Sequence, residues 1–448
     1  MGIPRAGARL SKKGSKVFYG WWIVAIGVVM NALAGGTYWT GFSVFFLPIT
    51  RDFGLTRAAT SFAYGVARLE GGLEGPAAGY LVDRVGPGKL IFVGALLAGV
   101  GFILLAFTHN FASFLLVYLG VLSLGFNSGF NHGVMAAVNN WFSRHRGLAM
   151  SMVAVGMSVG GAVIVPLMGL SIRTFGWRPT AAIAGVVVLV VVLPLSFWVR
   201  RSPESMGLRP DGDPPVPSGP PPQADVASHP SPFQEERASR DFTAREAFGT
   251  RSYWLLAFAI GLRIAAHTGV AVHIVPLMVW KGQTEAAAAL LVGVLAFTTL
   301  PVRLFVGWMG DRWSLQRMAS VGLLVGVGSL VLLMVTDGRL WQLVLFVMMF
   351  AVPESIASIT WAMIGDFFGR RSFATLRGVV TLVQSLMAMG APVFAGWVYD
   401  RSGSYMGALV PIAISYAAGV LLYWYLPRPR LPRRLALAED ASAGQRTA

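Results

Sequence analysis

The sequence predicts an all-α integral membrane protein with twelve transmembrane helices arranged as two six-helix bundles. Its composition is the first reason. Hydrophobic residues make up 55% of the 448 residues and charged residues only 12%, whereas a soluble domain has about 25% charged residues. A soluble protein of this length has no interior large enough for so much apolar surface. The lipid bilayer is therefore its expected partner, and the apolar runs and the basic residues are the two further reasons.

The apolar runs are long enough for helices, because a helix needs about 20 residues to cross the hydrocarbon core. The strands of a membrane barrel would instead give alternating segments of about 10 residues. Twelve runs are present, at residues 20–48, 58–81, 90–107, 112–138, 147–170, 178–199, 253–279, 286–308, 317–336, 341–364, 374–398 and 405–426.

The basic residues between these runs indicate the orientation. With both termini placed in the cytoplasm, 26 of the 36 Lys and Arg residues fall in cytoplasmic segments and seven in external loops. This is the bias of the positive-inside rule. We therefore expect a multi-pass protein of the inner (plasma) membrane with cytoplasmic termini. The net charge of +16 then reflects topology, and we expect no nucleic-acid partner.

One segment differs from the rest. Residues 202–249 are polar and rich in Pro, Ser and Gly, which predicts a cytoplasmic linker without a core of its own and disordered up to Arg237. The predicted organisation is a basic N-terminal tail at 1–18, a six-helix bundle at 19–201, the linker at 202–249, a second six-helix bundle at 250–427 and a cytoplasmic tail at 428–448.

The two halves of the chain share an internal repeat. The stretch from Gly79 to Arg84 after the second run is echoed by the stretch from Gly307 to Arg312 after the eighth run. Arg-Gly pairs likewise open the fifth and eleventh runs. Since each half has an even number of spans, the two halves have the same topology, as in transporters built from parallel repeats.

The motif Gly79-x-x-x-Asp83-Arg84-x-Gly86-x-Gly88-Lys89 resembles the loop 2–3 signature of the major facilitator superfamily. The resemblance covers nearly the whole chain. Five further stretches resemble its monocarboxylate-transporter and oxalate–formate-exchanger branch: Tyr19-Gly20-Trp21-Trp22, Trp141-Phe142-x-x-x-Arg146-Gly147-x-Ala149, His273-x-Val275-Pro276, Arg303 and Asp366-x-Phe368-Gly369-Arg370-Arg371. The resemblance implies the major facilitator fold and alternating access, in which the bundles rock around a midplane site.

The repeated loop is a candidate gate. Asp83 would face the positive N-terminus of the eleventh span at the cytoplasmic edge and could hold that side closed. A stripe of glycines, Gly71, Gly72, Gly75 and Gly79, is expected to share one face of the second span, where a neighbouring helix can approach closely. The predicted gating residues are Gly79, Asp83, Arg84, Gly86, Asp311 and Arg312.

Ionisable side chains inside spans cost at least about 2.5 kcal/mol each on insertion scales, so each is a candidate for function. Six stand out: Arg68, Glu70, Glu74, Arg263, Arg303 and Glu354. For Arg68 we expect an ion pair between spans. The resemblance implies that Arg303 binds a substrate carboxylate, which arginine can grip with two parallel hydrogen bonds. If a protein group pairs with Arg303 instead, Glu354 is the main candidate, and Glu354 and Glu70 are the candidates for proton coupling.

The sequence also departs from that branch. Where the animal members carry a lysine in the first span, this chain reads Tyr38-Trp39-Thr40-Gly41, and Thr299 stands where they carry an aspartate before the arginine of span 8. The eleventh span has Gln384 and Ser385 instead of the lysine of oxalate exchangers. The proton relay of the branch is therefore not carried over.

Neutral polar residues complete the predicted cavity. Asn127 and Asn131, one helical turn apart in the fourth span, are the best candidate pair. The predicted substrate-binding residues are Arg303, Arg263, Asn127, Asn131, His132, His267, Tyr38, Asn31 and Gln384.

The most consistent function is a secondary active transporter for a small organic anion, a mono- or dicarboxylate, coupled to protons or working by exchange. The alternative is an exporter of drugs or other amphipathic compounds, which would use acids such as Glu70 or Glu354. A sensor would need a signalling appendage, and the linker and tail are short. The sequence has no nucleophile–base pair, phosphate loop or metal cluster and no cysteine. We therefore expect no enzyme activity, no cofactor and no metal, and a monomer.

Overall fold

The computed structural model of the chain describes residues 18–74, 80–82, 84–142, 145–212, 242–310, 312–369 and 372–429. These residues form helices joined by short loops. Eleven helical segments of this part are long and apolar enough to cross a membrane. The second predicted span begins with the helix Arg57–Leu73 and then enters residues outside the described part.

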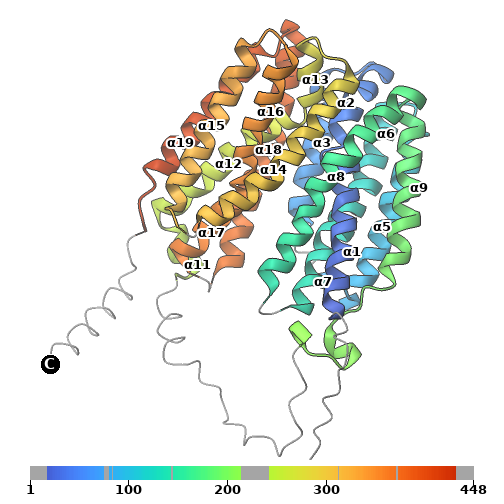
Figure 1. The fold of residues 1–448 in the computed structure, drawn as a ribbon, viewed down its shortest axis with the longest axis vertical. Coiled ribbons are helices and arrows are strands. Elements are labelled where there is room, and N and C mark those ends of the chain that lie inside the picture. The colour runs from blue at the N-terminus through green and yellow to red at the C-terminus, as the bar shows by residue number, and fades with distance from the viewer. Residues whose placement is uncertain are drawn as a thin grey trace, which may run out of the picture.

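The N-terminal bundle contains the first six predicted spans (Figure 1). The first span is continuous from Tyr19 to Asp52. The elements are α1 (Tyr19–Ala34), η1 (Gly35–Trp39), α2 (Phe42–Asp52), α3 (Arg57–Leu73), α5 (Pro87–Leu105), α6 (Phe111–Val117), η2 (Tyr118–Ser123), η3 (Phe126–Gly133), α7 (Val134–Trp141), α8 (Arg146–Phe175) and α9 (Trp177–Ser196).

The C-terminal bundle contains the other six spans, two of which are divided into two helices. Its elements are α12 (Arg251–Ala271), α13 (Ile274–Trp280), α14 (Glu285–Gly310), α15 (Leu315–Val335), α16 (Leu340–Ser355), α17 (Ala357–Phe368), α18 (Phe373–Ser402) and α19 (Met406–Trp424).

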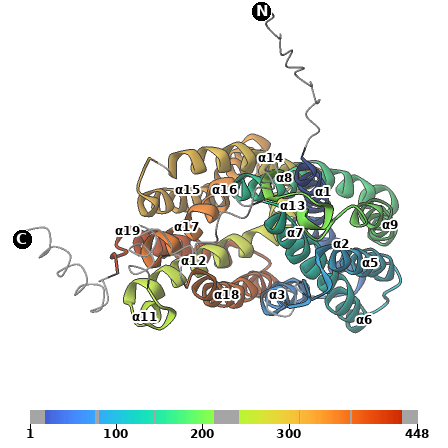
Figure 2. The same cartoon turned by 90° about the horizontal axis from the view of Figure 1, so that it is seen from below.

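The two bundles lie side by side, with the N-terminal one blue to green and the C-terminal one yellow to red (Figures 1 and 2). Two seams join them, α3 against α18 and α8 against α14. Small residues line both seams. A Cβ atom on Gly396 would lie 2.6 Å from the backbone nitrogen of Ala58, and one on Gly161 would lie 2.7 Å from the Cβ of Ala296. Helix backbones in a membrane can approach this closely where small residues meet.

Among the described residues, three segments are π-helical, a detail that the apolar runs do not predict. They are η1 in the first span and η2 and η3 in the fourth. Glycines accompany them, and η3 lies so near α5 that a Cβ on Gly129 would be 2.8 Å from the Cα of Gly94. A π-helical turn holds more residues than an α-helical turn, so it changes which side chains share a face, and such turns are frequent at functional sites.

The ends of the linker are ordered against the bundles, which corrects the prediction of disorder up to Arg237 where it covers residues 202–212. Two 3-10 helices, η4 (Pro203–Met206) and η5 (Pro210–Gly212), follow the first bundle. The carboxylate of Asp211 accepts a hydrogen bond from the backbone of His145 at 3.2 Å. Before the second bundle, Phe242 is buried against Phe368 and precedes α11 (Ala244–Phe248). Local contacts, which composition does not reveal, order these ends.

Several predicted features lie outside the described residues. They are residues 1–17 of the N-terminal tail, residues 213–241 of the linker and residues 430–448 of the C-terminal tail. The end of the bundles from which the linker emerges is called the linker end below, and the opposite end the far end. In Figure 1 the linker end is the lower one.

Candidate substrate site

A cavity of about 330 Å³ lies between the two bundles. Helices of both bundles line it, so a solute inside would touch both halves of the internal repeat. Six residues that the sequence analysis selected as substrate or proton sites line this cavity: Asn31, Asn131, Arg263, His267, Arg303 and Glu354.

The cavity carries an excess of positive charge. Three guanidinium groups line it, those of Arg68, Arg263 and Arg303. Among its described lining residues, Glu354 is the one carboxylate. Arginine does not lose its proton in proteins. One carboxylate therefore leaves two of the three cations without a matching negative charge.

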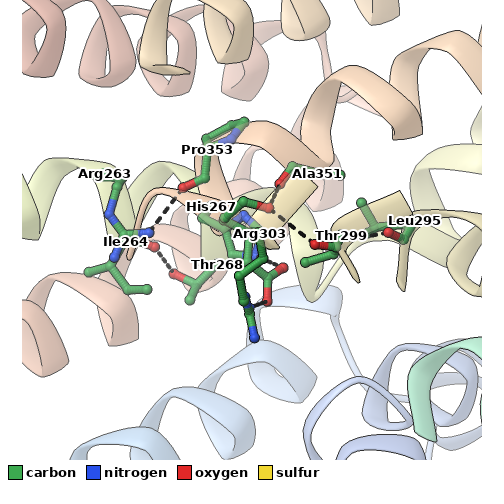
Figure 3. A network of polar contacts seen from close by, with 11 residues as sticks. Arg263, Ile264, His267, Thr268, Leu295, Thr299, Arg303, Ala351 and Pro353 are labelled. Carbon is green, nitrogen blue, oxygen red and sulfur yellow. Dashed lines mark hydrogen bonds and ion pairs between the residues drawn. The ribbon is translucent and has the colours of Figure 1, made fainter. Parts of the chain in front are cut away.

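Glu354 is held by two partners from neighbouring helices, Arg303 and His267, which are both labelled in Figure 3. Its Oε1 lies 3.5 Å from Nη2 of Arg303 on α14, and its Oε2 lies 3.2 Å from Nε2 of His267 on α12. The expectation that Glu354 is the protein partner of Arg303 is thus confirmed. The contact to Arg303 is long for a charge-assisted hydrogen bond, which is usually 2.7–2.9 Å. Arg303 therefore has donor capacity left for a second acceptor.

Helix geometry explains why Glu354 reaches the cavity. Pro353 lies inside α16, which ends at Ser355, and α17 begins at Ala357 after a short break. The backbone carbonyl of Pro353 lies at this break. Nη1 of Arg263 donates to that carbonyl at 3.2 Å. The broken helix thus places a carboxylate and a carbonyl beside two arginines.

Arg263 and His267 lie one turn apart on α12. Arg263 is only 3% exposed, and its Nε has no hydrogen-bond partner among the described residues. The ring of His267 stacks on Phe350, with centroids 4.9 Å apart and planes at 8°. Its Nδ1 also has no partner among the described residues. Arg263 is thus held by the carbonyl of Pro353 and His267 by the ring of Phe350, and each keeps one nitrogen atom for a ligand.

The structure corrects the expectation for Arg68. None of the described carboxylates lies within ion-pair distance of its guanidinium group, which sits 4.7 Å from the ring centroid of Trp39 and lines the cavity. A cation over a Trp face is stabilised by the ring quadrupole. Trp39 and Tyr64 also line the cavity, and the sequence analysis missed both. Tyr64 lies four residues before Arg68, and this spacing could have identified it.

The predicted pair of Asn127 and Asn131 is divided. Asn131 lines the cavity. Asn127 is 1% exposed and lies against Gly71 of α3, where a Cβ atom would be 2.7 Å from its Oδ1. Both residues belong to η3, where Asn127 packs against α3 and Asn131 faces the cavity.

Four more predicted residues do not line the cavity. Tyr38 stacks on Phe126, with centroids 4.7 Å apart, and its hydroxyl donates to Ser123 at 3.0 Å. Glu70 faces the fourth span together with Glu74. His132 and Gln384 are half-buried on η3 and α18. The structure therefore places Tyr38, Glu70 and Asn127 in a second polar region inside the N-terminal bundle.

Only part of the predicted gating motif is described. Gly79, Asp83 and Asp311 lie outside the described residues. The guanidinium of Arg84 donates to the hydroxyl of Tyr80 at 3.2 Å, and that of Arg312 lies 4.1 Å from the ring centroid of Trp308. Each arginine thus contacts the aromatic residue four positions before it, so the repeat extends to local structure. Gly86 has a φ of 89°, a left-handed conformation that favours glycine, and it precedes α5.

The glycine stripe does not present one face, which corrects that expectation. A Cβ on Gly71 would meet Asn127 of the fourth span, whereas a Cβ on Gly72 would meet Oγ of Ser385 on α18 at 2.8 Å. Gly75 and Gly79 lie outside the described residues. Consecutive residues on a helix point about 100° apart, so these two glycines serve two different neighbours.

Hydrogen bonds join the bundles at the far end. The backbone amides of Arg57 and Ala58 at the start of α3 both donate to the carboxylate of Asp400 on α18, at 2.9 Å each. The guanidinium of Arg57 lies over the ring of Tyr399, 3.4 Å from its centroid. Nε2 of His273 lies 2.9 Å from Oγ of Ser61 across the same seam.

An ion pair between Arg51 and Glu285 adds a further contact between the bundles at the far end. The far end is thus held closed in this conformation.

Comparison with known families agrees with this architecture. The Major Facilitator Superfamily family model matches residues 24–361 and 253–445 of the chain. Human monocarboxylate transporter 11 is 25% identical over 430 residues, covering 92% of this chain and 83% of that protein. Monocarboxylate transporter 12 of Xenopus laevis is 24% identical over 399 residues, covering 87% of this chain and 85% of that protein.

A solved structure has the same fold. The inward-facing, unoccupied crystal structure of a bacterial homologue of the human lysosomal transporter Spinster superposes with a TM-score of 0.68 at 16% identity, covering 92% of this chain and 97% of that chain. These relatives are membrane transporters and not enzymes. The helical architecture, the family match and the cavity between two related bundles establish that the chain belongs to the major facilitator superfamily and is a multi-pass membrane transporter.

Proposed function

We propose that this transporter moves a small organic anion, a mono- or dicarboxylate, across the membrane by alternating access. The excess of positive charge in the central cavity carries this proposal. Arg68, Arg263 and Arg303 line the cavity with Glu354 as the one described carboxylate. A drug exporter would need free acids there, whereas Glu354 is already bound to Arg303 and His267.

Arg303 is the residue assigned to the substrate carboxylate. Its guanidinium has a planar array of donors, and a carboxylate can accept two of them in parallel. The long contact to Glu354 is easily replaced, so a substrate carboxylate can take the place of the Glu354 oxygen. The names of the similar monocarboxylate transporters support the same substrate class.

The other cavity residues would define orientation and specificity. Arg263 and His267 each keep a nitrogen without a partner among the described residues, and these can donate to a second oxygen of the solute. Asn31 and Asn131 approach from the N-terminal bundle. A solute held by both bundles is the arrangement that alternating access requires.

Glu354 is assigned to proton coupling if the transporter is a symporter. When the substrate displaces Glu354 from Arg303, the carboxyl group loses its positive neighbour and can take up a proton. Glu70 is the rival carrier. If neither carries a proton, the transporter works by exchange of one anion for another.

Gating would alternate between the two ends of the molecule. The far end is closed by Asp400 at the N-terminus of α3. At the linker end, the motif residues Gly79, Asp83 and Asp311 are proposed to close the cytoplasmic side when the far end opens. We assign the protein to the plasma membrane, with its termini and its linker in the cytoplasm, as the bias of Lys and Arg predicts.

A stability screen tests the anion site. Purified full-length protein would be heated with mono- and dicarboxylates and with size-matched neutral amides and amines. A ligand that binds only the native state raises stability by RT ln(1 + [L]/Kd), so we expect a rise in Tm with one or more carboxylates and none with the amines. The rise should be lost in Arg303→Ala. A folded Arg303→Ala protein that keeps the response would refute the anion site at Arg303.

A further inference from the structure

The polar region inside the N-terminal bundle lies apart from the central cavity. Its centre is a pair of carboxyl groups that face the fourth span, Glu70 near the end of α3 and Glu74 at its C-cap, one turn further on. Neither residue lines the cavity, and neither does Asn127. We propose that Glu70, Glu74 and Asn127 form a binding site for one monovalent cation, a proton or Na⁺. The site deepens the proposed transport function by supplying a coupling ion, but the binding itself requires no anion.

Like charges meet at this site. The carboxyl groups of Glu70 and Glu74 interact directly with each other, and both are about half-buried. Oγ of Ser128 donates to Oε2 of Glu74 at 3.2 Å. Hydroxyl groups, those of Ser123 at Glu70 and Ser128 at Glu74, do not neutralise two adjacent negative charges in a membrane-embedded bundle, and such charges require a positive counterpart.

The free oxygen atoms point to the same ligand. Oε2 of Glu70, Oε1 of Glu74 and Oδ1 of Asn127 are all buried and have no hydrogen-bond partner among the described residues. Asn127 is 1% exposed, and its Nδ2 donates to Oγ of Ser123 at 3.1 Å. A buried acceptor left without a partner costs about 1–3 kcal/mol. Three such acceptors on neighbouring side chains match a cation, because hard cations bind oxygen ligands.

A glycine permits this arrangement. A Cβ atom on Gly71 would lie 2.7 Å from Oδ1 of Asn127. The amide side chain therefore rests on the backbone of α3 between the positions of Glu70 and Glu74. The adjacent Gly72 faces α18 instead, where its Cβ would meet Ser385. Because Gly71 has no side chain, the amide of Asn127 has room at the site. Gly72 makes room for Ser385 instead.

The π-helical segments direct polar groups to the same place. Ser123 ends η2 and Asn127 belongs to η3. From the first span, Tyr38 next to the end of η1 donates its hydroxyl to Ser123 at 3.0 Å. Irregular helix turns of this kind recur at functional sites.

The other titratable groups around the site come from three spans. Tyr38 faces it from the first span, and Tyr118 of the fourth span packs on Tyr38 with ring centroids 5.9 Å apart. Arg68 lies one half-turn away on α3 with its guanidinium over Trp39. His132 lies on η3 within reach of the backbone of Gly71. From α18, Ser385 packs on the opposite side of α3 at Gly72.

The position suggests how the ion would be coupled to the anion. Arg68 in the cavity and Glu70 at the cation site are two residues apart on α3. An anion bound at Arg68 and a cation bound at Glu70 would therefore act on the same helix. That helix also forms the seam with α18, so the occupancy of both sites bears on how the bundles move.

The test uses purified full-length protein without any anion substrate. The first arm measures Tm at fixed pH while NaCl replaces choline chloride at constant ionic strength. The second arm counts the protons bound on acidification in weakly buffered KCl. A Na⁺ site predicts a saturable rise in Tm with Na⁺. A proton site predicts no Na⁺ response and one proton taken up near neutral pH, where isolated carboxyl groups are ionised, in wild type but not in Glu74→Gln.

Matched variants keep the test specific. Glu70→Gln, Glu74→Gln and Gly71→Ala should weaken the binding about ten-fold or more, the scale seen when a ligand or its support is removed from an ion site. Gly72→Ala, with the same change one residue away, should leave it unchanged. The proposal is overturned if folded wild type shows neither response, or if either response survives in the Glu70→Gln, Glu74→Gln double variant.

The same preparations distinguish this inference from the anion site. A carboxylate response that persists without any cation response refutes only the cation site. A cation response without a carboxylate response refutes only the anion proposal.

Discussion

The carboxylate of Asp400 caps the N-terminus of the helix that begins at Arg57, although the two residues belong to different bundles. Its two oxygens accept one backbone amide each, from Arg57 and from Ala58, at 2.9 Å. An anion at a helix N-terminus is stabilised by the free amides and by the helix dipole. These two hydrogen bonds form only when the far ends of the two bundles meet, so they stabilise the conformation in which the far end is closed.

Asp400→Ala should therefore open the far end. Thr56 remains as the N-cap residue of this helix. Losing an anion from a helix N-terminus costs about 1 kcal/mol, which corresponds to roughly a five-fold shift in a two-state equilibrium. Spin labels at His109→Cys and Arg339→Cys, both exposed at the far end of different bundles, would report the distance by pulsed electron resonance. A larger population at long distance is expected. Arg401→Ala is the control, because Arg401 packs on Trp397 within its own helix. Identical distributions in Asp400→Ala and wild type would rule out this role of Asp400.

Asp83→Asn should act in the opposite direction. If Asp83 holds the linker end closed, its loss weakens cytoplasmic closure and slows transport while membrane insertion is unaffected. The same pair of far-end labels should then show a larger short-distance population, and Asp400→Ala should partly restore the balance in the double variant. Unchanged turnover in Asp83→Asn would show that the motif is an ordinary charged loop.

Arg303→Lys should fail to replace arginine. Lysine keeps the charge but presents a single ammonium group, so it loses the second parallel hydrogen bond to a carboxylate. A charge-assisted hydrogen bond contributes about 1.5–3 kcal/mol, and the affinity should fall by about ten-fold or more. Binding of a carboxylate identified in the stability screen would be measured by calorimetry. Arg317→Lys, an exposed arginine, is the matched control, and equal affinity in both variants would exclude two-pronged binding.

Glu354→Gln should separate coupling from binding. Glutamine keeps the size of the side chain but neither competes as an anion for Arg303 nor carries the proton. Proteoliposomes should lose accumulation driven by a pH gradient yet retain exchange of the carboxylate, with equal or tighter binding. Glu204→Gln, a change at an exposed acid in η4 at the start of the linker, serves as the control. Intact accumulation in Glu354→Gln would show that Glu354 is not the proton carrier and would favour Glu70 in that role.

Cysteine labelling tests the topology in this cysteine-free chain. Single cysteines at Ser15 and Ser218 should resist a membrane-impermeant reagent on intact cells, since both would be cytoplasmic. A cysteine at Asn110, which is exposed at the far end, should react. Each variant should react after the cells are opened, which controls for accessibility. Reaction of Ser218→Cys on intact cells would invert the proposed orientation.

Hydropathy along the sequence determined the number of spans, the two halves and the residues that had to be explained inside the membrane. It did so because the transfer free energy of each side chain depends mainly on that side chain and can be read one residue at a time. The same reasoning identified Arg303 and proposed Glu354 as its partner, since an unpaired cation in a bundle needs a counter-charge and few acids were within reach.

Tertiary structure alone decided which polar residues meet. Asn131 lines the cavity whereas Asn127 packs against Gly71, and Arg68 lies over Trp39 rather than beside a carboxylate. Asp400 finds the start of α3 across the seam, more than 340 residues earlier in the chain. The rotation of a helix about its axis and the choice of its neighbour depend on the packing of glycines and side chains from distant segments, and no local pattern in the sequence records that packing.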